Sequence, residues 1–372
     1  MVLVLKKLST AGGDFGLLVY PPLTRRQTFK KMFAKSSTAL SASQENNPAH
    51  TKSVDHPSSF SKAWAVRYMR TVNQSVPTPT FTNELELRAA VAKTLHQALR
   101  TVSAKAWNKT EHLLSQEVIR HQLHPDIIDP WAIAGDVFDI FDKAFESYAL
   151  DVSPERFAVN IAPELGNIRA KFTAVDPRVI GFVSMLFHYT GQLLLQLVDP
   201  AQQGVLKLYF KAIDDHLYMP LQRAYDAASS YPYTSPELNI VRTLLPQSSL
   251  VAKRIVAQVL EAFPNHQCFS GPLKSSSVRL SSTRDAEMFQ TYLWVCLLEG
   301  NASVVQQELF PLCVMLYPTF NVRWELVRYM LKLLQREVGQ LLAYDEFALC
   351  ASHLDLLQSI FSPEVVEAGA TA

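Results

Sequence analysis

Residues 176–200, DPRVIGFVSMLFHYTGQLLLQLVDP, decide the fold of this chain. An Asp-Pro pair stands at each end, and the twenty residues from Val179 to Val198 carry no acidic or basic side chain other than one histidine. Asp is a favourable helix N-cap and proline is tolerated in the first helical turn, so each pair predicts a helix start. The stretch has membrane-spanning length, but its Ser, His, Tyr, Thr and Gln side chains would need partners in lipid. We therefore predict a central helix that is buried by neighbouring helices.

The same punctuation recurs on both sides of this stretch. The pairs are Asp129-Pro130, Ser153-Pro154, Asp176-Pro177, Asp199-Pro200 and Ser235-Pro236, and the first four are spaced 24, 23 and 23 residues apart. This spacing predicts helices of about 15–20 residues with short connections, which makes neighbours antiparallel. No convincing run of alternating polar and apolar residues indicates a strand. The sequence thus predicts an all-α fold, a multi-helix bundle of capped antiparallel helices with a disordered N-terminal tail.

Composition divides the chain into segments. Residues 1–80 are basic and rich in Ser, Thr and Pro, which predicts a flexible segment. Helical periodicity runs through 81–263, and Pro220 predicts a bend within the helix expected at 201–228. Residues 264–282 interrupt the pattern and predict a linker or small hairpin.

Helices resume after that interruption. We expect the first of them at 283–299, with Ser282 and Asp285 as capping residues and Gly300 closing its C-terminus. The rest of 283–372 is predicted to form a C-terminal helical subdomain that packs on the first bundle.

Glycine content and charge restrict the functional classes. The chain has 12 glycines in 372 residues, about half the usual share, and it contains no GxxxxGK[ST], GxGxxG, GxSxG or HExxH motif. Residues 1–60 carry a net charge of +5, so the remaining chain is slightly acidic and has no general basic face for nucleic acid. We predict a non-enzymatic protein with no cofactor.

The cysteines and the N-terminal segment bear on location. The gaps between Cys268, Cys296, Cys313 and Cys350 match no metal or redox spacing, so we expect reduced, mostly core cysteines in a reducing compartment, the cytoplasm. Residues 24–44 are rich in Arg, Lys and Ser and lack acids. They fit an organelle transit peptide, although we favour a disordered tail, or a start at Met32 that leaves residues 1–31 outside the native protein.

Two groups of residues are candidates for function. His188, Asp214, Asp215 and His216 lie on adjacent predicted helices, where they form either a buried polar network, which we favour, or a metal site. A basic stripe recurs at helical spacing in Arg328, Lys332 and Arg336. Lys253 and Arg254 lie in a helical hairpin that could also be a helix-turn-helix. These five cations are candidate contacts for a protein partner or for DNA.

Three stretches carry a resemblance. They are DPRVIGFVSMLFHYTGQ at 176–192, YFKAIDDHLYMPLQRAYDAA at 209–228 and FPLCVMLYPTFNVRWELVR at 310–328. Together they resemble a family of all-helical cyanobacterial proteins, the heterocyst-differentiation regulators, over residues 85–362. The resemblance implies a link to transcriptional control of cell differentiation.

Three functions follow as expectations. The first is a non-enzymatic regulatory protein that works through protein partners, with DNA as a further candidate partner and without a membrane span. The second is a helical binding module that associates with a photosynthetic pigment-protein assembly. The third is a helical metal- or tetrapyrrole-binding protein that uses His188 and His216.

Overall fold

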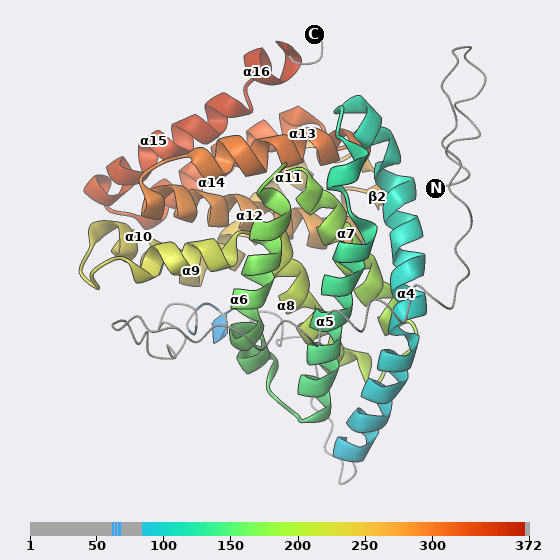
Figure 1. Ribbon diagram of the computed structural model, residues 1–372. Helices are drawn as coiled ribbons and strands as arrows, with labels where there is room; N and C mark the ends of the chain where they lie inside the picture. Colours follow the sequence, from blue (N-terminus) through green and yellow to red (C-terminus); the bar gives the residue numbers. More distant parts are fainter. Residues whose placement is uncertain (1–61, 63, 65, 68–83, 369–372) are drawn as a thin grey trace, which may run out of the picture. The chain divides into compact units, whose positions relative to one another are not determined.

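The computed structural model describes residues 62, 64, 66, 67 and 84–368, all within the unit Asp55–Ala372 (Figure 1). Across these residues the predicted all-α fold is confirmed. The predicted disordered tail lies outside the described residues. The helices are α4 (Glu84–Arg120), α5 (Pro130–Ala149), α6 (Pro154–Thr173), α7 (Val179–Leu195), α8 (Gln203–Tyr218), α9 (Leu221–Ser229), α10 (Pro236–Leu244), α11 (Ser248–Ala262), α12 (Ser276–Glu299), α13 (Phe310–Thr319), α14 (Trp324–Leu341), α15 (Tyr344–Ile360) and α16 (Pro363–Ala368).

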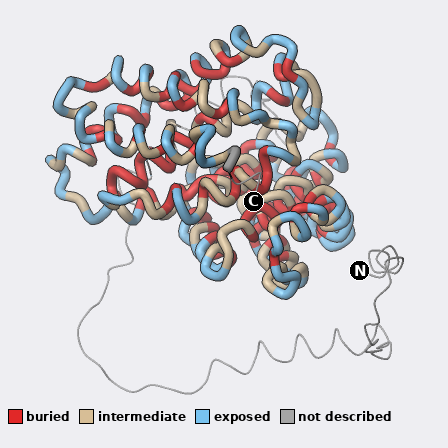
Figure 2. Tube along the Cα trace, turned by 90° about the horizontal axis from the view of Figure 1, so that it is seen from above, coloured by how far each residue is buried: buried red, intermediate tan, exposed pale blue. Residues whose placement is uncertain are grey.

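The helices form two sets that cross each other. In Figure 1, α4, α5, α6 and α7 run side by side, whereas α9, α12, α14 and α15 run across them. Helix α4 packs along α5 and α7, α8 packs against α6 and α7, and α12 packs against α11 and α9. Figure 2 shows the buried residues gathered along the inner faces of the helices and the exposed residues on the outside.

Helix α7 is the central helix that the sequence predicted. Its buried residues include Ile180, Phe182 and Phe187, and Phe187 stacks on Phe141 of α5 with ring centroids 6.0 Å apart. No helix within the described residues has the length and apolar character needed to cross a membrane. The apolar stretch is therefore core, and the neighbouring helices α4, α5, α6, α8 and α13 cover it.

The predicted caps form at some helix starts and not at others. The Asp129 carboxylate accepts from the backbone N–H groups of Trp131 and Ala132, and the Ser153 hydroxyl accepts from that of Arg156. The Asp176 carboxylate instead accepts from the Arg178 backbone N–H within a turn that precedes α7. Ser235 precedes α10 but its side chain makes no capping hydrogen bond.

Pro220 separates two helices. Helix α8 ends at Tyr218, and Met219 is extended with φ −111° and ψ 145°, as the residue before a proline prefers. Helix α9 then begins at Leu221. The predicted bend is therefore a complete break.

The region 264–282 contains the strands β1 (Gln267–Cys268) and β2 (Gly271–Pro272), which pair antiparallel. Helix α12 begins at Ser276, seven residues before the expected start, because the Ser275 hydroxyl caps it by accepting from the Val278 backbone N–H. The expected cap at Ser282 was wrong, and Asp285 lies inside the helix. Gly300 closes α12 in the left-handed conformation, φ 64°, as expected.

A π-helical turn, η3 (Val305–Leu309), leads directly into α13. The short 3₁₀ helices η1 (Pro125–Ile127) and η2 (Leu245–Gln247) join α4 to α5 and α10 to α11. All four cysteines are free thiols; Cys268 is half-buried and the other three are buried.

Candidate functional site

His188 and Asp214 form an ion pair between α7 and α8. His188 Nδ1 lies 2.7 Å from an Asp214 carboxylate oxygen, and His188 Nε2 lies 2.8 Å from the side-chain nitrogen of Gln192. Arg284 of α12 approaches the same carboxylate at 3.7 Å. Both nitrogens of His188 are thus engaged by protein groups, and the Asp214 carboxylate lies between the side chains of His188 and Arg284.

Asp215 points to a different side of α8. Its carboxylate is fully buried and accepts from Lys211 Nζ at 2.8 Å, one helical turn away. Burial raises the pKa of Asp215 well above its usual value and lowers the pKa of Lys211 to about 8. Asp215 Oδ1 has no hydrogen-bond partner among the described residues. This pair is therefore a costly buried feature of the interior.

His216 faces aromatic rings rather than His188. Its Nδ1 donates to the Ala212 carbonyl at 2.8 Å, and its ring packs edge-on against Trp64 with centroids 5.5 Å apart. Burial lowers the pKa of His216 to about 4, so the ring is neutral near pH 7. The structure thus divides the four predicted residues between two ion pairs and one aromatic cluster. Within the described part of the chain, no three His, Cys, Asp or Glu side chains gather as a metal site.

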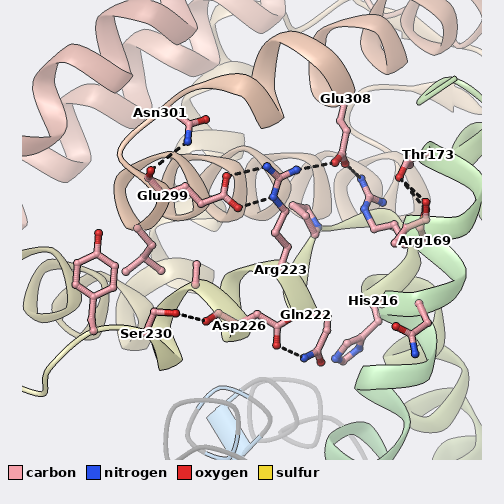
Figure 3. A pocket seen from close by; sticks show the side chains of 17 residues that line it. Arg169, Thr173, His216, Gln222, Arg223, Asp226, Ser230, Glu299, Asn301 and Glu308 are labelled. Carbon is pink, nitrogen blue, oxygen red and sulfur yellow. Dashed lines mark hydrogen bonds and ion pairs between the residues drawn. The ribbon is translucent and has the colours of Figure 1, made fainter. Parts of the chain in front are cut away.

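A cleft of about 790 Å³, with polar side chains on its walls, opens between α6, α9 and the C-terminal end of α12 (Figure 3). Its walls carry the side chains of Arg169, Thr173, Gln222, Arg223, Asp226, Glu299, Asn301 and Glu308. His216 forms part of the same lining, which connects the cleft to the aromatic cluster around Trp64.

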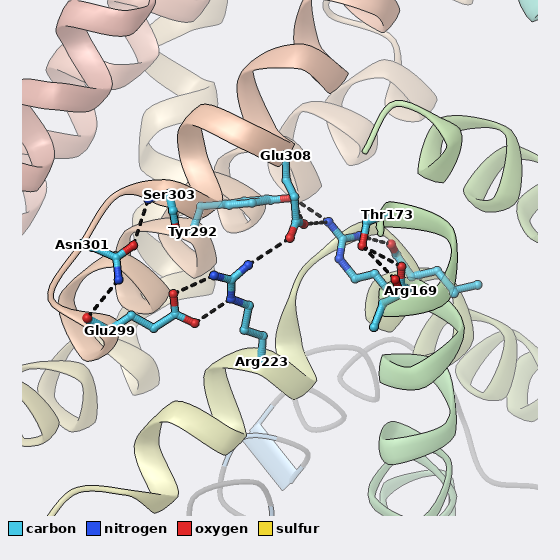
Figure 4. A network of polar contacts seen from close by, with 10 residues as sticks. Arg169, Thr173, Arg223, Tyr292, Glu299, Asn301, Ser303 and Glu308 are labelled. Carbon is cyan, nitrogen blue, oxygen red and sulfur yellow. Dashed lines mark hydrogen bonds and ion pairs between the residues drawn. The ribbon is translucent and has the colours of Figure 1, made fainter. Parts of the chain in front are cut away.

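One wall of the cleft is an ion-pair network (Figure 4). Glu308 accepts from Arg169 at 2.8 Å through one carboxylate oxygen and from Arg223 at 3.0 Å through the other. Arg223 also makes a bidentate pair with Glu299, at 2.5 and 2.7 Å. Arg169 is deeply buried and donates further to the Tyr292 hydroxyl at 2.6 Å and to the Leu217 carbonyl.

This network joins elements that are far apart in the sequence. Arg169 comes from α6, Arg223 from α9, Glu299 from the end of α12, and Glu308 from the π-helical turn. The two arginines and the two glutamates compensate one another in charge, so the wall locks helices together and presents polar groups rather than a free base or nucleophile. No local spacing in the sequence relates these four residues, so none of them was predicted as a site residue.

Two of the predicted basic residues, Arg254 and Arg336, meet where α11 lies beside α14. Arg254 lies 3.4 Å and Arg336 lies 3.8 Å from the buried carboxylate of Glu337, and Arg336 also donates to the Gln258 side chain. Lys253 and Lys332 are exposed. Arg328 is the exception, since it is mostly covered and lies 3.7 Å from Glu325. We call Lys253, Arg254, Lys332 and Arg336 the basic edge.

Comparison with known proteins gives one match. Residues 209–360 match the family model of phycobilisome proteins. The match starts in α8 and runs to the last turn of α15, which is less than half of the chain, and it includes the basic edge and three of the four residues of the ion-pair network. No curated protein and no solved structure matches this chain.

Proposed function

We propose that this protein is a non-enzymatic helical module that associates with a photosynthetic pigment-protein assembly of the phycobilisome type. The observation that carries the proposal is the match of residues 209–360 to phycobilisome proteins. The matched helices α8 to α15 supply much of the buried core, so the match concerns a packed body rather than a short motif. The paired charges in the cleft are also consistent with a structural role.

The basic edge is the docking surface that we propose. Its four cations come from two adjacent helices, and the one acidic side chain between them, Glu337, is buried. Leu250 lies one turn before Arg254 on α11 and is 45% exposed, which adds an apolar contact to the cationic surface. Such a surface fits an acidic face of a protein partner, and exposed ion pairs of this kind weaken as salt rises.

The test is co-sedimentation of the purified chain with isolated phycobilisomes through a density gradient at several salt concentrations. We expect association at low salt that is weakened about fourfold or more by a basic-edge variant in which the four cations are changed to Ala and Glu337 to Gln, because each exposed ion pair contributes about 0.2–1 kcal/mol. The Glu337→Gln change keeps a buried carboxylate from losing its cations. The matched control removes four exposed cations outside the matched residues: Lys93, Lys105, Arg156 and Lys207.

Two results would contradict the proposal. If the chain never moves with the phycobilisomes, the association itself is wrong. If the basic-edge and control variants bind equally well, the assembly is right and the docking surface is wrong. Salt-dependent binding to DNA, lost in the basic-edge variant, would favour the regulatory interpretation instead.

The other interpretations have less support. A role in transcriptional control, the likeness to heterocyst-differentiation regulators and a cytoplasmic location stay predictions from the sequence. The metal- or tetrapyrrole-binding interpretation gains nothing from His188 and His216, which face different partners. A purified protein that carries colour or bound metal would revive it.

A further inference from the structure

A short helical stretch that precedes α4 lies against the matched region. Its described residues are Lys62, Trp64, Val66 and Arg67, and it appears as the pale blue ribbon below Gln222 in Figure 3. Trp64 is only 3% exposed, although it precedes the first residue of α4, Glu84, in the sequence and belongs to none of the helices α4 to α16. Trp64 and Arg67 stand three residues apart, so both side chains project from nearly the same side of the turn.

The Trp64 ring occupies an aromatic site formed by α8 and α9. It packs edge-on against His216, at 5.5 Å and an interplanar angle of 84°, and against Tyr225 at 5.8 Å. The two receiving rings are held independently of Trp64. His216 donates to the Ala212 carbonyl at 2.8 Å, and the Tyr225 hydroxyl lies 3.5 Å from His216 Nε2. Edge-to-face contacts of this kind add specificity to the burial of the indole.

Arg67 reaches a second site, at the junction of α11 and α12. Its guanidinium donates to the hydroxyl of Ser248, a residue that is 1% exposed. Burial lowers the pKa of Arg67 to about 10, and the nearby charge of Glu287 opposes that shift. Glu287 is fixed in turn by the Ser249 hydroxyl, which donates to it at 2.6 Å. The site is thus a preformed acceptor for a cation.

The two sites together form what we call the Trp–Arg cradle: His216, Tyr225, Ser248 and Glu287. All four belong to the region of the phycobilisome match, whereas the segment that fills the cradle lies well before it. Each cradle residue also makes a hydrogen bond to a residue of the helical body other than Trp64 and Arg67. These contacts attach all four cradle residues to the helical body independently of the segment that carries Trp64 and Arg67.

We propose that the Trp–Arg cradle is a recognition site for a helical turn that carries Trp and Arg three residues apart, and that Trp64 and Arg67 occupy it in competition with partner segments of the same chemistry. The occupant and the cradle belong to the same chain, so their contact is intramolecular. Intramolecular contacts of this kind have effective concentrations on the order of millimolar. Suppose that a free segment and the intramolecular one each bind the empty cradle with a dissociation constant of about 0.1 mM. The free segment would then bind the filled cradle about tenfold more weakly.

The test uses the full chain and a labelled peptide with the sequence of residues 59–70, SFSKAWAVRYMR. In fluorescence anisotropy, the variant Trp64→Ala/Arg67→Ala should bind the peptide at least about tenfold more tightly than the wild-type chain. A peptide in which the same Trp and Arg are both replaced by Ala should not bind. Adding Glu287→Gln to the double variant should weaken binding, since it removes the charge that faces the guanidinium.

Three outcomes would overturn the proposal. The first is a double variant that keeps its helical circular dichroism but does not bind the peptide. The second is equal binding by wild type and variant, which would place the peptide elsewhere. The third is binding that is indifferent to Glu287→Gln. Should the double variant lose its helical signal, Trp64→Ala alone is measured against wild type, and an unchanged affinity for the peptide then refutes the proposal.

Discussion

Replacement of Glu308 by Gln removes the charge that two arginines share. The Glu308 side chain is 13% exposed and that of Arg169 is 7% exposed, so neither is well solvated. After the change Arg223 keeps its bidentate partner Glu299, whereas Arg169 keeps only the neutral acceptors Tyr292 and Leu217. The variant therefore leaves one cation buried without a counter-charge.

The expected loss in the free energy of unfolding is about 3–5 kcal/mol, the usual cost of removing one partner of a buried ion pair. Glu299→Gln is the matched control because it removes the same charge from the same network. There Arg223 is 38% exposed and keeps Glu308, so water and the remaining pair compensate. We expect about 1 kcal/mol or less for that variant.

Urea denaturation followed by far-UV circular dichroism measures both values, and the slope of the free energy with urea should stay unchanged. Equal midpoints for the two variants, or a larger loss for Glu299→Gln, would refute the reasoning. The double variant Arg169→Met/Glu308→Leu supplies a further check, because replacing both members of a buried pair by apolar residues costs far less than breaking it. It should be more stable than Glu308→Gln.

Three further predictions concern packing, backbone and pH. Gly166→Ala should lower the free energy of unfolding by about 1–3 kcal/mol, since its Cβ would meet Gln222 Cβ at 2.5 Å, whereas Gly191→Ala, with 3.5 Å to its nearest neighbour, should be neutral or slightly stabilising. Gly300→Ala should cost about 1–2 kcal/mol in the same urea assay, because Gly300 has φ 64°. His216 is neutral in the folded state with a pKa of about 4, so stability is intact above pH 6.5 and falls between pH 6.5 and 4, by up to about 3 kcal/mol. His216→Gln should flatten that part of the pH–stability curve, and an unchanged curve would contradict the burial of a neutral ring.

The predictable part of the fold depends on local chemistry. Asp129 and Ser153 cap helices as predicted, because a capping hydrogen bond involves only the next two or three residues. The start of α12 was misplaced because the five serines between 275 and 282 offer several equivalent caps, and packing of Val278 into the core selects the first. Local signals thus establish that a helix exists more reliably than where it begins.

The cleft was not predictable because its network depends on tertiary contacts. Arg169 and Glu308 lie 139 residues apart. From its own helix alone, each would be predicted to be an exposed charged residue. Within the basic edge, Lys332 and Arg336 are related directly by helical spacing in the sequence. That Arg254 of a second helix lies near Arg336 is visible only in the structure.

The π-helical turn at Val305–Leu309 has a consequence for the length of the chain. A π turn holds one more residue than an α turn, so winding the same residues as a regular α-helix would rotate α13 by about 100°. Leu312 and Met315, which now face Gly181 of α7, would then turn away from it. Deleting one residue within the turn would instead restore regular winding and leave α13 in its present orientation, so the turn absorbs one residue of chain length without disturbing the interior.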